Sequence, residues 1–202
     1  MQIDVLQEVR RRRRAREDEG GEGWWDACTE LRKRHDVAAR EALERHVRRG
    51  TLNEQGIAEV VHHASRDLSR KTNIEVGGRY GQTFAMQLGN MAWTRDQRAP
   101  AMAAALRTLL HGGCTLDDVL KRQPELSTFV FATLAGYLLW PERYLPWIRA
   151  VHDGAGSLRP NEEALTRKPN EADYAKFIGA TRELLEGMDC QPCMVDQLLY
   201  KV

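Results

Sequence analysis

Arginines are the residues whose type and spacing point most clearly to a chemical role. Six of them crowd one short stretch near the N-terminus: Arg10, Arg11, Arg12, Arg13, Arg14 and Arg16. On about two turns of helix, so many guanidinium groups repel one another unless anions neutralise them. Phosphates suit this role, because a guanidinium binds them through paired hydrogen bonds and each contact releases counterions. The run therefore predicts contact with nucleic acid. The alternative is neutralisation within the chain by nearby acidic residues: Glu8, Glu17, Asp18 and Glu19.

A second basic segment, Lys-Thr-Asn-Ile-Glu-Val-Gly-Gly-Arg-Tyr-Gly at 71–81, is rich in glycine. Its glycines allow close approach to a phosphate backbone, and an aromatic ring there is able to stack on a base. The residues that would make these contacts are Arg70, Lys71, Arg79 and Tyr80. The segment matches neither a P-loop nor a dinucleotide-binding fingerprint, since it lacks the Gly-Lys-Ser/Thr ending and a preceding strand. An ordinary connecting loop is the alternative.

No catalytic constellation is visible in the sequence. Cys190 and Cys193 have the CxxC spacing of redox dithiols and of half a zinc site, but neither a βαβ context nor a second ligand pair accompanies them. Buried or incidental thiols are the simpler interpretation. His62 and His63 are adjacent on a predicted helix and point about 100° apart, so they cannot chelate one ion together. The chain is therefore predicted to be a non-enzyme with no cofactor and no metal, with Cys190 and Cys193 as the weak metal candidates.

Composition limits the class of protein. The 202 residues are 42% hydrophobic, which indicates a folded chain, and 30 basic against 29 acidic residues leave a net charge of +1. Attraction to nucleic acid must therefore come from local clusters of charge. Four cysteines are too few for a disulfide scaffold, and neither a secretory signal nor an apolar run long enough to cross a membrane is present. We expect a cytoplasmic protein without membrane contact.

Hydrophobic periodicity predicts helices to position these residues. Apolar residues recur at helical spacing over 3–18, 24–49, 126–140 and 171–188, whereas period-two alternation is absent beyond a few residues. Gly50 is a predicted C-cap, and Thr115 with Asp118 forms a predicted capping pair. The fold class is all-α: an irregular bundle of about eight to ten helices with one short non-helical glycine-rich loop. We expect an N-terminal region at 1–113 and a C-terminal subdomain at 114–202, or one compact domain containing both.

The C-terminal part resembles a known helical module. An apolar helix ends in Trp-Pro-Glu-Arg-Tyr-Leu-Pro at 140–146, and a later amphipathic helix is followed by Val-Asp-Gln-Leu-Leu-Tyr at 195–200. This order resembles the helical module found beside McrB-type AAA+ restriction ATPases and related bacterial phage-defence proteins. The resemblance covers 126–202. The matching residues, which we expect to be mainly structural, are Pro141, Arg143, Tyr144, Asp196 and Leu199.

These observations lead to two hypotheses of different class. The first is a non-catalytic nucleic-acid-binding module, for DNA, in a bacterial defence or restriction system with an AAA+ ATPase or a nuclease as a candidate partner. The second is a protein–protein adaptor or oligomerisation domain of such a system, in which the long amphipathic helix at 24–49 and the Arg-rich helix pack against a partner helix. The sequence leaves the oligomeric state open.

Overall fold

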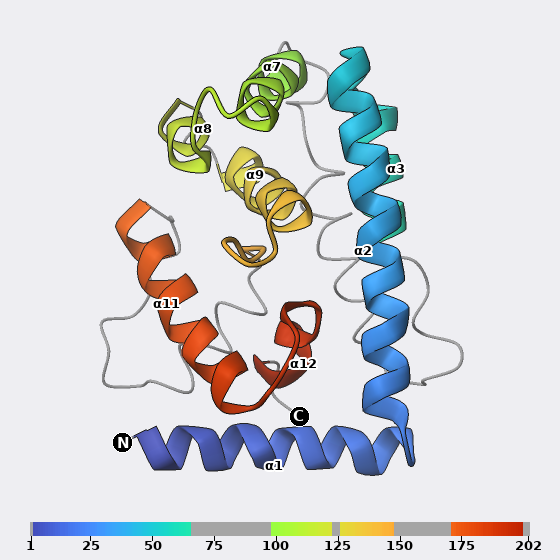
Figure 1. Cartoon of the computed structure of the whole chain (residues 1–202), viewed down its shortest axis with the longest axis vertical. Coiled ribbons are helices and arrows are strands. Elements are labelled where there is room, and N and C mark those ends of the chain that lie inside the picture. The colour runs from blue at the N-terminus through green and yellow to red at the C-terminus, as the bar shows by residue number, and fades with distance from the viewer. Residues whose placement is uncertain (1, 66–97, 123–125, 148–170, 200–202) are drawn as a thin grey trace.

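Helices make up the regular secondary structure of this protein. The computed structural model describes residues 2–65, 98–122, 126–147 and 171–199. Within these ranges the chain forms α-helices and a short 3₁₀ helix, and no strand. The predicted all-α class is therefore confirmed, and the steep crossings between helices in Figure 1 make the bundle irregular. The glycine-rich loop predicted at 71–81 lies outside the described residues.

Two N-terminal helices form a corner. Helix α1 (Gln2–Gly20) crosses one end of the molecule, and α2 (Trp24–Arg49) rises from the end of α1 (Figure 1). The chain turns between them at Gly21 and Gly23, whose φ angles of 83° and 71° are easily reached only by glycine. The interval between the helices predicted at 3–18 and 24–49 therefore contains a sharp corner that sets the direction of α2.

Helix α3 (Glu54–Ser65) folds back along α2 (Figure 1). Gly50 closes α2 in the left-handed conformation, as predicted, and its N–H donates to the carbonyls of His46 and Val47. His46 then joins the two helices, because its Nδ1 lies 2.9 Å from Thr51 Oγ1 and its Nε2 lies 2.8 Å from Glu59 Oε2. The two helices thus form a tight hairpin.

Helix α9 (Leu126–Leu139) packs against α2, α7 (Arg98–Leu110) and α8 (Leu116–Arg122). Helices α7, α8 and α9 occupy the end of the molecule away from α1 (Figure 1). The predicted capping pair starts α8, since Asp118 N–H donates to Thr115 Oγ1 and Thr115 N–H donates to Asp118 Oδ2. Residues 131–138 of α9 are all buried, which matches its nearly uniform apolar sequence.

The Trp-Pro-Glu-Arg-Tyr-Leu-Pro segment forms the turn after α9. Tyr174 anchors this turn, because its hydroxyl donates to the carbonyl of Leu145 at 2.7 Å and accepts from the Leu145 N–H at 3.3 Å. Burial among the rings of Phe129, Trp147 and Phe177 raises the pKa of the Tyr174 phenol. These contacts hold the turn after α9 against α11.

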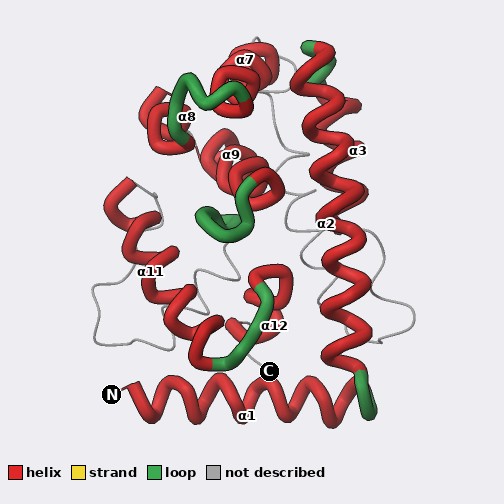
Figure 2. Tube along the Cα trace, in the orientation of Figure 1, coloured by secondary structure: helices red, strands yellow, loops and turns green. Residues whose placement is uncertain are grey.

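The C-terminal elements return to α1. Helix α11 (Glu171–Gly187) ends beside α1, and a green loop in Figure 2 leads from it into the 3₁₀ helix η1 (Pro192–Met194) and α12 (Val195–Leu199). Buried residues from the first helices and from these last ones belong to one hydrophobic core. None of the helices in the described ranges combines the length and apolar character needed to cross a membrane.

Candidate nucleic-acid interface

The arginine run of α1 is divided between two faces of the helix. Arg12 and Arg16 point inward and are each only 5% exposed, whereas Arg10, Arg11 and Arg14 are exposed to solvent. This division follows helical geometry. Side chains three to four residues apart share a face, so the inward stripe that begins with Val5 and Val9 continues through positions 12 and 16. That spacing was the signal in the sequence that separates the two groups.

Arg12 joins the first helix to the end of the described chain. Its Nε donates to Glu8 Oε1 at 2.9 Å, and its Nη1 donates to the carbonyl of Leu199 at 3.0 Å. Leu199 is the last residue of α12, where helix carbonyls lack intrahelical partners and carry negative partial charge. A buried guanidinium satisfies that carbonyl, so Arg12 is a structural residue.

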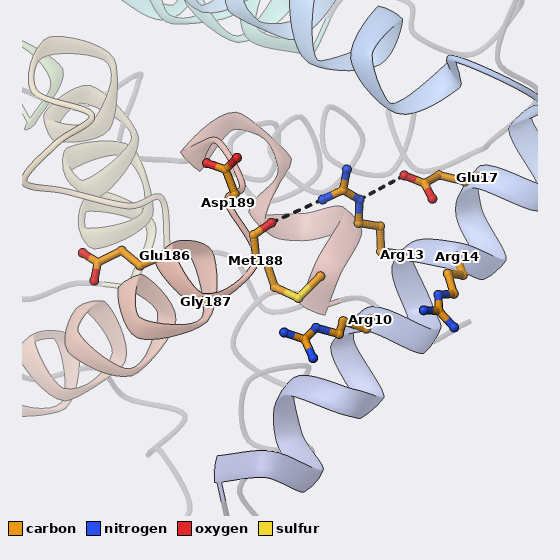
Figure 3. Close-up of a pocket in the computed structure, with 8 residues that line it drawn as sticks. All are labelled: Arg10, Arg13, Arg14, Glu17, Glu186, Gly187, Met188 and Asp189. Atoms are coloured by element: carbon orange, nitrogen blue, oxygen red, sulfur yellow. Dashed lines mark hydrogen bonds and ion pairs between the residues drawn. The ribbon is translucent and has the colours of Figure 1, made fainter.

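Arg13 makes a similar contact one residue later. Its Nε donates to Glu17 Oε1 at 2.9 Å, and its Nη1 donates to the carbonyl of Met188 at 3.3 Å, immediately after α11 (Figure 3). The guanidinium carbon lies 4.8 Å from the centroid of the Trp25 ring, which adds a cation–π contact. Arg13 therefore fixes the end of α11 against the corner between α1 and α2.

Arg32, which the sequence analysis did not single out, is a third arginine of this kind. It is 6% exposed, and its Nη1 donates to the carbonyl of Cys193 in η1 at 2.7 Å. Its position was readable in the sequence, because it continues the buried stripe of Trp25 and Cys28 at helical spacing. Arg12, Arg13 and Arg32 together bind three carbonyls of the segment 188–199, and we call them the carbonyl-binding arginines.

Glu8 stands between the two faces of α1. It accepts from Arg12 on the inward side and from both Nε and Nη2 of Arg11 on the outward side, at 2.8 and 2.9 Å. These hydrogen bonds, first from Arg11 and then from Arg12, lower the pKa of Glu8 from 4.5 to about 2. The expected neutralisation of the run within the chain is thus observed for part of it.

Arg10 and Arg14 differ from the exposed Arg11, which pairs with Glu8. Neither forms an ion pair with any described residue. They lie one helical turn apart, and Arg11 stands beside them, so three guanidiniums share the outward face. We call Arg10, Arg11 and Arg14 the outward arginines. This face is the part of the predicted interface that the described residues offer to a polyanion.

A groove of about 400 Å³ lies between this helix and the end of α11. In Figure 3 the three arginines and Glu17 come from α1, whereas the other labelled residues come from the end of α11, where the Glu186 carboxylate points away from α1. The residues lining the groove are Arg10, Arg13, Arg14, Glu17, Glu186, Gly187, Met188 and Asp189. On the α1 wall Arg13 pairs with Glu17, so Arg10 and Arg14 are the arginines of the groove that have no ion pair with a described residue.

The other predicted site residues are placed as follows. Arg70, Lys71, Arg79 and Tyr80 lie outside the described residues. Cys190 Sγ lies 3.6 Å from the Gln191 carbonyl and Cys193 Sγ lies 3.9 Å from the Thr29 carbonyl, so each thiol contacts backbone. Within the described ranges, no three His, Cys, Asp or Glu side chains are arranged to hold a metal ion.

Comparisons with family models, with curated proteins and with solved structures found no match to this chain.

Proposed function

We propose that this chain is a non-catalytic nucleic-acid-binding module that contacts the phosphates of DNA through the outward arginines. The observation that carries the proposal is the exposure of Arg10 and Arg14 on adjacent turns, without an ion pair to any described residue. Two exposed guanidiniums about 6 Å apart along a helix are well spaced to neutralise neighbouring phosphates. A role in bacterial defence or restriction, beside an AAA+ ATPase or a nuclease, rests on the C-terminal resemblance alone.

A salt series tests the proposal. Fluorescence anisotropy with short double-stranded and single-stranded DNA is measured from about 50 mM salt upward, where log affinity falls with a slope of about 0.9 per phosphate contact. In the variant Arg10→Gln/Arg14→Gln, we expect weaker binding to every sequence and a slope smaller by about 2. Both side chains are exposed, so the fold should be retained.

The matched control is Arg48→Gln/Arg49→Gln, which removes the same charge from two exposed arginines in the last turn of α2. We expect this variant to keep the wild-type slope. An equal loss in both variants would show that net charge alone governs binding. Failure of the wild-type protein to bind DNA at about 50 mM salt would refute the proposal, since even non-specific electrostatic binders associate there.

An adaptor or oligomerisation domain is the alternative. Among the described residues, Val37 is the one large hydrophobic side chain that is exposed, at 42%. Stable protein interfaces have an apolar core, so a partner on these helices would have to be held mainly by charge. Light scattering at micromolar concentration distinguishes the alternative: an oligomer that dissociates as salt rises would favour it, and a monomer at all salt concentrations would count against self-association.

A further inference from the structure

The outward face of α1 carries a stripe of exposed polar side chains. Gln7, Arg10, Arg11, Arg14 and Asp18 are exposed and follow one another at the spacing of one helical face. They line one shallow hollow of about 460 Å³. In Figure 1, α1 crosses one end of the molecule and the other described helices lie on one side of it. Among the described elements, none covers this stripe.

The positive charges of the stripe flank Gln7. Successive residues of an α-helix are turned by about 100°, so Arg10 and Arg14 lie to one side of Gln7 and Arg11 lies to the other. The positive part ends at Arg14, because Asp18 carries the opposite charge one turn later. A polyanion on this face therefore meets a glutamine between two sets of arginines.

Arg11 is able to bind a phosphate while it remains paired with Glu8. Its Nε and Nη2 donate to Glu8, its Nη1 takes part in neither bond, and its side chain is 65% exposed. Glu8 is shared with Arg12, so one carboxylate faces two guanidiniums and the local charge stays positive. Glu8 thus fixes the Arg11 guanidinium on its side of the stripe.

The aromatic side chains of the described residues are poorly placed to bind unpaired bases. Single-strand binders stack successive bases on accessible aromatic rings. No phenylalanine, tyrosine or tryptophan in the described ranges is exposed, and the half-buried Trp140 and Tyr144 pack on each other in the turn after α9. A basic helix without such rings fits a duplex better, because the bases of a duplex are already stacked.

From these features we propose that residues 7–14 of α1 lie in the major groove of double-stranded DNA. A helix about 10–12 Å wide enters a groove about 12 Å wide, whereas the minor groove, at about 6 Å, is too narrow. Arg10 and Arg14 contact phosphates of one strand, Arg11 contacts the other strand, and Gln7 binds adenine N6 and N7 between them. This placement rests on the proposed function and makes it more specific, since it names duplex DNA and one groove.

Filling one groove of the duplex tests the placement. Anisotropy titrations at fixed salt compare a plain duplex with two modified duplexes of the same sequence. In the first, every cytosine carries a glucosylated hydroxymethyl group on C5, which fills the major groove and adds no charge. In the second, inosine replaces guanine and removes the N2 amino group from the minor groove. We expect the first to bind at least about tenfold more weakly than the plain duplex and the second to bind equally.

Gln7 is tested by its base preference. Duplexes selected by the wild-type protein from a random pool should share an A·T pair, and G·C at that pair should weaken binding at least about fivefold. In Gln7→Ala this ratio should fall to about one, while the salt slope stays unchanged because no phosphate contact is lost. Gln55→Ala, which removes another exposed glutamine on α3, is the control and should retain the ratio.

Equal binding to the plain and the glucosylated duplexes would overturn the major-groove placement and leave the proposed function standing, because phosphate contact alone would then carry binding. Tighter binding to single-stranded than to double-stranded DNA would overturn it in the same way. A random pool without a shared pair, or a preference that survives in Gln7→Ala, would overturn the base contact of Gln7. Absence of binding to every DNA at about 50 mM salt would refute the proposed function as well.

Discussion

Arginine has a different role on each of the two faces of α1. On the inward face, Arg12 is buried and donates to a backbone carbonyl at the end of the chain's last described helix. On the outward face, Arg10 and Arg14 are exposed and pair with no described residue. A run of arginine therefore is not one electrostatic feature. Helical periodicity decides which members stabilise the fold and which remain available to a ligand.

The carbonyl-binding arginines satisfy backbone carbonyls at the ends of helices. The described chain ends in short helical elements whose terminal carbonyls lie near the core, where an unsatisfied carbonyl is costly. The carbonyl-binding arginines reach across from α1 and α2 to supply donors. Their long stems can cross apolar surface while the guanidinium stays hydrogen-bonded, which a shorter donor could not do.

The largest expected effect on stability comes from replacing the buried Arg12 on the inward face. Arg12→Met removes a buried donor from the Leu199 carbonyl and a partner from Glu8. We expect the free energy of unfolding to fall by about 2 to 4 kcal/mol. Urea denaturation followed by circular dichroism measures this change.

Arg11→Gln is the matched control for the inward face, because Arg11 also binds Glu8 but is exposed. Its effect on the free energy of unfolding should be much smaller than that of Arg12→Met, because solvent screens an exposed ion pair. Equal losses in the two variants would contradict the division of the run into a structural and an exposed face.

A middle-sized effect is expected at Glu8, which contacts both faces. Its pKa is lowered from 4.5 to about 2 in the folded protein, so its contribution is fully present above pH 4.5 and is lost as pH falls toward 2. Since Glu8 is about one-third exposed, solvent screening reduces that contribution to about 1 kcal/mol. Thermal unfolding measured between pH 7 and pH 2 should therefore show that the melting temperature of Glu8→Gln falls less on acidification than that of the wild-type protein.

Glu44→Gln serves as the comparison for Glu8, because Glu44 pairs with the exposed Arg48. The melting temperature of Glu44→Gln should fall on acidification as much as that of the wild-type protein. If Glu8→Gln and the wild-type protein lost stability in parallel on acidification, the arginine contacts of Glu8 would not be the source of the effect.

The smallest expected effect has the opposite sign. Asp189→Gly relieves the left-handed conformation and removes a carboxylate from the C-terminal end of α11, so stability should rise by about 0.5 kcal/mol. A differential thermal shift measures this change, and a loss of stability would indicate that the carboxylate makes a contact the fold requires.

The sequence alone was sufficient for much of the local structure. The range of α2 matched its periodic apolar pattern, Gly50 ended it, and Thr115 with Asp118 began α8. These features depend on residues within one or two turns of each other, so short-range propensity and capping determine them. The apolar run at 126–140 likewise predicted a helix, which the structure shows as α9, Leu126–Leu139.

Only the tertiary structure decided what the arginines do. Arg12 and Leu199 are separated by 187 positions in the chain, and Arg32 and Cys193 by 161. No local pattern encodes such a contact, because it depends on the corner at Gly21 and on the path of the later helices back to α1. The sequence by itself determined that the protein is helical and where its positive charge is concentrated. Packing of distant segments determined which backbone carbonyls the buried arginines bind, since such contacts exist only in the assembled core.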